Sequence, residues 1–135
     1  MLFMVYTNAV VTDILLKKFR EIIKQRIDSD VSRLETDDVP GSYNGGVEQF
    51  ALESLDNLTA DNIETESDED TLQVEGEMYL DTTLVGLKEF NGEMVIAGNY
   101  SLHMVYHFTF EKTGNKYENL TLEYFEPLPV KRTMK

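Results

Sequence analysis

After Asp13, hydrophobic residues recur every three or four positions, which is the period of an amphipathic α-helix. The stripe consists of Leu15, Leu16, Phe19, Ile22, Ile23 and Ile27. Thr12 is suited to cap the free N–H groups of this helix, and Asp13 suits the positive end of its dipole. We therefore predict a helix that begins at Thr12-Asp13 and runs to about Leu34, before the breakers Pro40-Gly41 and Asn44–Gly46.

The second half of the chain changes to a period of two, which is typical of strands with one apolar and one polar face. Leu72–Leu84 alternates in this way, and from Met94 to Phe110 the even positions are mostly apolar. Gly98 interrupts the second run and indicates a bulge or a bend. A shorter alternation over Leu120–Tyr124 precedes Pro127, which we expect to stop the pairing.

Turn signals separate these segments. Asn91-Gly92 is the dipeptide that type I′ hairpin turns require, and residues 112–116 predict another turn. The acidic residues 67–70 lie between a weaker strand at 62–66 and the strand that follows. Residues 47–58 fit a short helix slightly better than a strand.

These elements predict an α+β fold, with an N-terminal amphipathic helix packed on a four- to five-stranded antiparallel meander sheet. A chain of 135 residues can bury its own core, and we expect a single domain over residues 1–126. In this interpretation residues 127–135 form a basic, flexible tail whose Lys131, Arg132 and Lys135 can lie on an acidic surface. The sequence does not fix the strand order.

Charge is distributed unevenly along the chain, whose formal net charge is −13. Residues 1–33 carry a net charge of +2, residues 34–126 carry −18 and the last nine residues carry +3. The central field repels nucleic acid and anionic lipid, and it favours basic partners. We therefore expect a basic protein surface as the partner, with neither direct nucleic-acid binding nor membrane binding. The basic residues at 17–26 are expected to offset the acidic half.

The chain contains no cysteine, which excludes a disulfide framework and thiol catalysis. Its apolar first twelve residues lack a basic leading region, and they are fewer than the roughly 20 that span a bilayer. We interpret them as a buried strand or a lead-in to the helix, and we expect a cytoplasmic protein.

Two histidines, His103 and His107, are four positions apart in the segment H-M-V-Y-H. On a strand, at roughly 3.3 Å per residue, they lie about 13 Å apart and cannot share a metal ion, although either can meet an acid such as Glu75 or Glu77 from a neighbouring strand. The sequence has no motif of a nucleophile elbow, a phosphate-binding loop or a zinc protease. We therefore expect no enzymatic activity, no cofactor and no metal.

The acidic segment E-T-E-S-D-E-D-T does not match the pattern of a calcium-binding loop. If Asp68 is position 1 of an EF-hand, Leu72 and Gln73 occupy the positions that require an acid and a glycine, so the match fails. A looser oxygen site of Glu66, Asp68 and Asp70 is the alternative to a hydrated turn.

The polar face of the predicted sheet is the strongest candidate for a binding surface. Its predicted binding residues are Glu75, Glu77, Tyr79, Asp81, His103 and His107. The neighbouring strands are expected to add Glu64, Glu66, Glu118 and Glu123. Tyrosine offers contact area at low entropic cost, and carboxylates steer a basic partner. The first hypothesis is therefore a small, acidic, non-enzymatic interaction protein.

Two alternatives stay open. One is an inhibitor that imitates nucleic acid and occupies a basic groove. A single strand places acids about 6.6 Å apart, whereas duplex DNA carries one charge per about 1.7 Å, so this imitation needs several aligned rows. The other alternative is a small hydrolase or isomerase with a pocket between helix and sheet.

Overall fold

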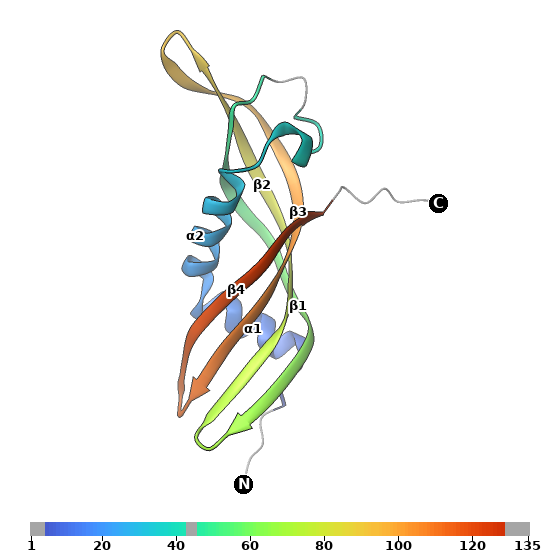
Figure 1. The fold of residues 1–135 in the computed structure, drawn as a ribbon, viewed down its shortest axis with the longest axis vertical. Helices are drawn as coiled ribbons and strands as arrows, with labels where there is room; N and C mark the ends of the chain where they lie inside the picture. The colour runs from blue at the N-terminus through green and yellow to red at the C-terminus, as the bar shows by residue number, and fades with distance from the viewer. Residues whose placement is uncertain (1–4, 43–45, 129–135) are drawn as a thin grey trace, which may run out of the picture.

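The computed structural model describes residues 5–42 and 46–128, with side chains up to Glu123. Three helices come first: α1 (Asn8–Lys18), α2 (Arg20–Val31) and the short 3-10 helix η1 (Thr36–Asp38). Four strands follow: β1 (Gln49–Asp68), β2 (Thr71–Phe90), β3 (Glu93–Thr113) and β4 (Lys116–Leu128). The strands pair antiparallel in chain order (Figure 1), which confirms a helical N-terminus on an antiparallel meander.

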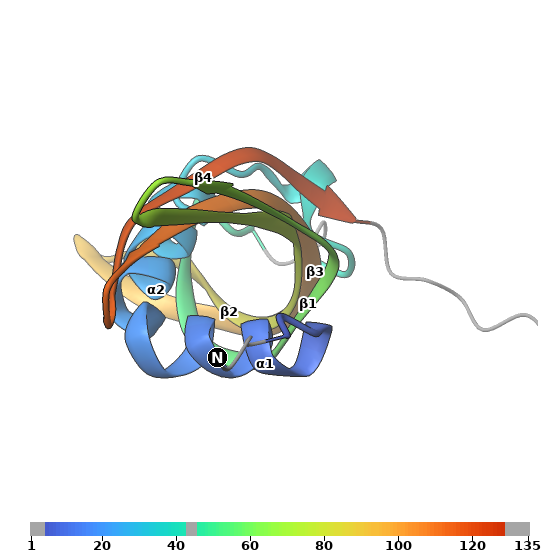
Figure 2. The same ribbon diagram turned by 90° about the horizontal axis from the view of Figure 1, so that it is seen from below.

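The sheet is strongly curled, and both α-helices lie on its concave side (Figure 2). We call the concave side the inner face and the opposite side the outer face. The two α-helices lie closest to β1, at one edge of the sheet. The β1–β2 and β3–β4 turns lie at one end of the molecule, and the β2–β3 hairpin projects at the other end (Figure 1).

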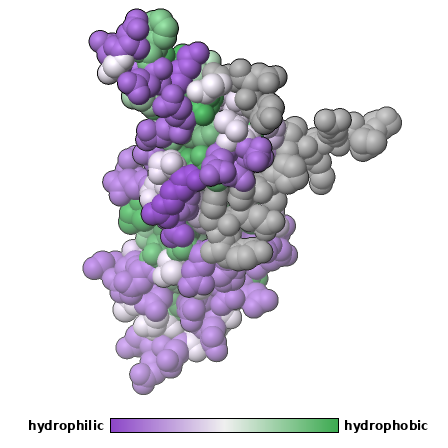
Figure 3. Space-filling view, turned by 45° about the horizontal axis from the view of Figure 1, so that its top comes forward, coloured by the Kyte–Doolittle hydropathy of each residue, from purple (hydrophilic) through white to green (hydrophobic). Residues whose placement is uncertain are grey.

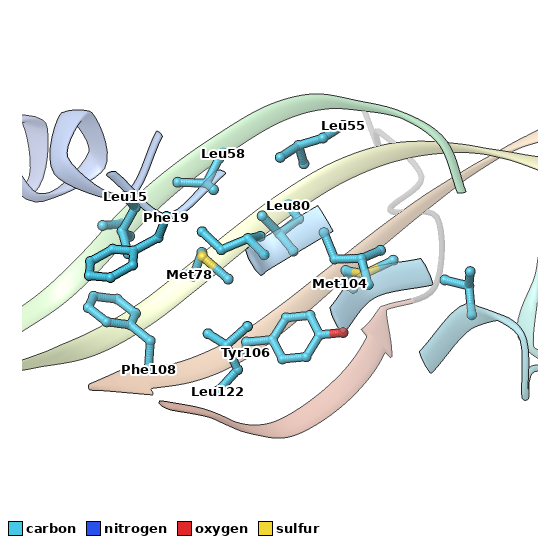
Figure 4. Close-up of a cluster of buried hydrophobic side chains, with 14 of the residues drawn as sticks. Leu15, Phe19, Leu55, Leu58, Met78, Leu80, Met104, Tyr106, Phe108 and Leu122 are labelled. Carbon is cyan, nitrogen blue, oxygen red and sulfur yellow. The ribbon is translucent and has the colours of Figure 1, made fainter. Parts of the chain in front are cut away.

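The core fills the space between the helices and the inner face (Figure 4). Phe19 from the helices packs on Phe110 of β3, with ring centroids 5.5 Å apart, and Phe110 stacks with Phe108 at 6.0 Å. Met78 and Met104 from the central strands are fully buried. Every strand therefore gives one face to the same apolar core, which fixes the opposite face as the one exposed to solvent.

The predicted single helix is in fact two helices, and its predicted beginning is wrong. The first helix begins at Asn8, where the Thr7 side chain accepts a hydrogen bond of 3.1 Å from the Val10 amide. The chain leaves the helical conformation at Phe19, with φ −125° and ψ 11°, and the second helix ends at Val31. Burial of the Phe19 ring against the sheet accompanies this break, and the apolar period alone could not show it.

For residues 47–58 the sequence leaves helix and strand open with a slight preference for a helix, and the structure has a strand, since β1 begins at Gln49. Two register shifts interrupt the β1–β2 ladder here, between Leu52 and Ser54 and between Leu55 and Asn57. Each shift inserts an extra residue, so the apolar positions no longer recur every two residues. Bulges thus gave this strand a spacing that resembled a helix, while the weaker strand predicted at 62–66 proves to be the end of β1.

The predicted turns are confirmed. Asn91 and Gly92 both have positive φ, at 55° and 84°, as a type I′ turn requires. The turn between β1 and β2 falls at residues 69–70, within the predicted acidic segment, and the turn between β3 and β4 falls at residues 114–115.

The bulge predicted near Gly98 is also confirmed, and it reverses the faces of the hairpin tip. Gly86 pairs with Gly98 but Leu87 pairs with Ile96, so Ala97 is the extra residue. Beyond it the even positions of β3 turn to the outer face, and Ile96 is 66% exposed. The expectation that even positions share one apolar face therefore fails for Met94 and Ile96.

Pro127 does not stop the pairing as expected. The strand β4 continues to Leu128, and Pro127 pairs with Met104 of β3. Since β4 lies at the edge of the sheet, one side of its backbone needs no partner strand, which is where proline is tolerated. Pro129 and the predicted basic tail residues lie outside the described residues.

A partly buried polar cluster joins α2 to β3 and β4. The Asp30 carboxylate accepts hydrogen bonds from the Tyr106 hydroxyl at 2.6 Å and from Arg26 Nε at 2.9 Å. Arg26 also donates to the Leu122 carbonyl at 2.7 Å, and its guanidinium lies 5.6 Å from the centre of the Tyr106 ring. We call this set the Asp30 clamp, because it holds the second helix in one position on the sheet.

We expect Tyr106→Phe to lower the free energy of unfolding by about 1–3 kcal/mol, because it removes a donor from a nearly buried carboxylate. Urea unfolding followed by circular dichroism measures the change. Tyr79→Phe on the outer face is the control and should change stability by less than about 0.5 kcal/mol. Equal losses in the two variants would contradict the clamp.

Alkaline pH should destabilise the protein through the same residue. Burial and the hydrogen bond to Asp30 raise the pKa of Tyr106 above its ordinary value. The stabilisation from this raised pKa is complete below about pH 10, the value in an unfolded chain, and is lost as pH rises beyond it. We therefore expect the wild-type free energy of unfolding to fall more steeply above about pH 10 than that of Tyr106→Phe.

Candidate binding surface

The outer face of the sheet gathers the acidic residues of all four strands. The ladder registers place the following carboxylates on it, and we call them the acidic rows: Glu64, Glu66, Glu75, Glu77, Asp81, Glu111, Glu118 and Glu123. Their side chains are exposed or half-buried. All six predicted binding residues lie on this face, because the two-residue alternation of β2 and β3 holds throughout their stretch.

Some of these acids directly oppose one another across neighbouring strands. Glu64 of β1 pairs with Glu75 of β2, and Glu111 of β3 pairs with Glu118 of β4. Like charges in such positions destabilise a sheet. The fold therefore retains an arrangement that lowers its own stability, which an acidic surface serving only solubility does not require.

Neutral donors hold several of the acidic side chains in place. Glu77 Oε1 accepts hydrogen bonds from Asn62 Nδ2 at 2.6 Å and from the Tyr79 hydroxyl at 3.0 Å. The hydrogen bond to Glu77, together with partial burial, raises the pKa of Tyr79. Nearer the β4 edge of the same face, Asn119 donates to Glu111 at 2.9 Å. These donors orient the carboxylates without cancelling their charge.

The two histidines have separate acidic neighbours. His103 Nδ1 contacts the Asp81 carboxylate, and His107 Nε2 lies 4.0 Å from the Glu75 carboxylate. The strand conformation confirms that His103 and His107 are not on one helical face, and the predicted neighbour Glu75 is confirmed for His107. Each pair is an ion pair only when the imidazole is protonated.

A second anchored carboxylate lies farther along the outer face. Asp56 accepts hydrogen bonds from Thr83 at 2.6 Å and from Ser54 at 2.7 Å. These two bonds lower the pKa of Asp56, so it keeps its negative charge more firmly than an ordinary aspartate. Asn99 also contacts the Glu53 carboxylate nearby.

Most basic residues lie away from the acidic rows, but Lys116 forms an ion pair of 3.4 Å with Glu118. Across β1–β4 the lysines are Lys88, Lys112 and Lys116, all close to hairpin turns. The helices carry the basic residues at 17–26, but they cover the inner face. Lys17 forms an ion pair with Asp13, and Arg26 forms one with Asp30. The basic side chains of these two ion pairs are therefore bound to acids of their own helices and do not pair directly with the acidic rows.

The acidic turn between β1 and β2 borders a hollow of about 810 Å³ that is open to solvent. Glu66, Asp68, Glu69 and Asp70 contribute to its wall. Within the described residues, no three histidine or acidic side chains gather closely enough to hold a metal ion. The looser oxygen site considered for this segment therefore has no set of ligands there.

The sequence interpretation missed several members of this surface, among them Glu111, Asn62 and Asp56. Glu111 follows Phe110 in the alternating run, so extending the odd positions by one more step would have found it. Asn62 could not be found in the same way. Its φ of 54° belongs to an irregular stretch of β1, where the register shifts between Asp61 and Glu64.

Comparison with family models, with curated proteins and with solved structures finds no match to this chain. Within the described residues, no helix combines the length and apolar character needed to cross a bilayer.

If opposed acids lower stability, neutralising one of them should stabilise the protein. We expect Glu64→Gln to raise the free energy of unfolding by roughly 0.2–1 kcal/mol at low salt, because it removes the repulsion from Glu75. The gain should shrink in high salt, which screens exposed charges. Glu93→Gln at the β2–β3 hairpin is the matched control, because Glu93 is exposed and pairs with Phe90, and an equal gain there would attribute the effect to net charge alone.

Proposed function

We propose that this protein is a small, non-enzymatic interaction protein that binds a basic protein surface through its outer face. The observation that carries the proposal is the joining of acids from four strands into neighbouring rows. Opposed acids such as Glu64 and Glu75 remain side by side although this lowers stability. A basic partner would relieve that repulsion, so binding would gain free energy that the isolated protein lacks.

The contacts around the rows support a preorganised surface. Glu77 is held by Asn62 and Tyr79, and Asp56 is held by Thr83 and Ser54. A carboxylate that is already oriented loses less conformational entropy when a lysine or an arginine binds it. The half-exposed Tyr79 ring adds an aromatic contact in the middle of the face, where interface anchors are most effective.

An inhibitor that imitates nucleic acid is the second candidate. It requires several aligned rows of acids, and adjacent strands about 4.8 Å apart bring the rows closer together than the acids within one strand. The register of Glu66, Gln73, Glu111 and Glu118 across the four strands favours this candidate. The hydrolase or isomerase alternative has less support, because apolar side chains fill the space beneath the helices.

Charge reversal tests the proposed surface. We expect the double variant Glu75→Lys and Glu77→Lys to bind a partner recovered by the immobilised wild-type protein at least about tenfold more weakly, because like charges would then face each other. The control is Glu21→Lys with Asp37→Lys, which makes the same change in net charge on α2 and η1. Binding is measured from low to high salt and should weaken as salt rises.

The result has distinct consequences for the two candidates. Retention of the partner by the outer-face variant, or equal loss in the control, would place the binding surface elsewhere. Duplex DNA added as a competitor distinguishes the two candidates. If DNA displaces the partner, the result supports the imitation of nucleic acid. If DNA does not displace the partner, the result supports a contact with a basic surface that does not bind DNA.

A further inference from the structure

The hairpin between β2 and β3 carries an apolar area at the far end of the outer face. The bulge at Ala97 turns Met94 and Ile96 to this side, where Leu87 pairs with Ile96. Met94 is 48% exposed and Ile96 is 66% exposed. With Val85, these residues form what we call the hairpin patch. Hydrophobic residues are visible at the projecting tip in Figure 3.

In the described part of the chain, the edge of β3 beside this patch has no partner strand. The pairing of β4 reaches His103, and within the described residues no strand pairs with Glu93–Leu102 on the side away from β2. The segment from Met94 to Leu102 contains no charged side chain. Sheet edges are usually protected by charges, prolines or covering elements, so an uncharged open edge next to exposed apolar side chains indicates a contact surface.

The other edge of the sheet differs from this one. The β1 amides of Leu52 and Ala60 donate to the side chains of Asp28 at 2.8 Å and Thr12 at 2.9 Å. The helices therefore satisfy part of the β1 edge.

The net charge of the chain indicates which partner suits the hairpin patch and its edge. Two copies of a chain with a net charge of −13 repel each other over most of their surfaces, and the repulsion is least where charged side chains are missing. Carboxylates border the patch, because Glu89 pairs with Met94 across the hairpin and Asn99, the partner of Val85, contacts Glu53. The repulsion between two copies is therefore least along the β3 edge, where Met94–Leu102 carries no charged side chain and the same edge of a second copy can pair with it.

We propose that the hairpin patch and the adjoining β3 edge form the contact between two copies of this chain. A two-fold axis places Met94 and Ile96 of one copy against the same residues of its partner, with the two uncharged edges side by side. Such a contact is self-complementary and closes on itself, so it gives a dimer and not a filament.

The dimer is expected to be weak and to respond to salt in a characteristic way. A patch of a few side chains is smaller than the roughly 800 Å² per partner of a standard interface. Because salt screens the repulsion between the two acidic bodies, dimerisation should strengthen as salt rises. Binding of a basic partner to the acidic rows should weaken under the same change, so the two surfaces are distinguishable.

Sedimentation equilibrium of the purified chain over a range of protein and salt concentrations tests this proposal. Ile96→Thr retains a β-branched side chain and is expected to lower the association constant at least about tenfold, because the lost apolar contact counts once in each copy. The matched control is Ile22→Thr on α2, where the isoleucine is 52% exposed, and this variant should dimerise like the wild type. Circular dichroism verifies that both variants fold.

Three outcomes would overturn the proposal: a monomer at every concentration and salt level, a dimer unaffected by Ile96→Thr, or a dimer equally weakened by Ile22→Thr. Glu75→Lys with Glu77→Lys should leave a dimer through the hairpin patch in place. Loss of the dimer in that variant would assign the contact to the acidic rows instead. Failure here leaves the proposed contact with a basic partner unaffected, because that contact uses other residues.

Discussion

The pairing register of β2 with β3 is the constraint on which the rest of the structure depends. These two strands form the centre of the sheet, and their ladder runs from Thr71–Thr113 to Phe90–Glu93 with a single shift. A slip of one residue would exchange the two faces and expose Phe108 along with the rest of the buried row. The burial of the core therefore fixes which side chains form the outer face, and the acidic rows follow directly from the packing of the inner face.

The helices complete this arrangement by closing the concave side of the sheet. Their apolar residues fill the core, while the Asp30 clamp and the bonds from Thr12 and Asp28 to β1 fix where they lie. The clamp is partly buried, with the Asp30 side chain 10% exposed and that of Arg26 39% exposed, and its charged members are paired with each other and with polar partners. Buried charges are tolerated when they are satisfied in this way, and the geometry they require allows α2 only one position.

The acidic rows and the hairpin patch differ in the kind of side chain that they present to solvent. The acidic rows concentrate like charges that destabilise the free protein, whereas the hairpin patch exposes the apolar side chains of Met94 and Ile96, with Glu89 at its border. Both features depend on the extra residue Ala97, because the side chains of β3 change from one face of the sheet to the other at this bulge. One insertion thus divides a single strand into a part that serves the core and a part that presents Met94 and Ile96 to solvent.

Regular alternation made much of the second half of the chain predictable. Where apolar and polar residues alternate without interruption, from Leu72 to Leu84 and from Leu102 to Phe110, each side chain can be assigned to a face from its position alone. The turn at Asn91-Gly92 was equally clear, because few residues adopt positive φ without strain. The six predicted binding residues were therefore found on one face.

Tertiary structure alone decided the features that involve an extra residue or a distant partner. The bulges of β1 gave a strand the apolar spacing of a helix. The break at Phe19 depends on burial of its ring against a strand some ninety residues later in the chain. The sequence by itself determined the faces of the regular strands, because a local period of two leaves only one way to bury them. It could not determine the positions of the bulges, the meeting of Asp30 with Tyr106 or the opposition of Glu64 and Glu75, because each depends on contacts between segments that the local pattern does not relate.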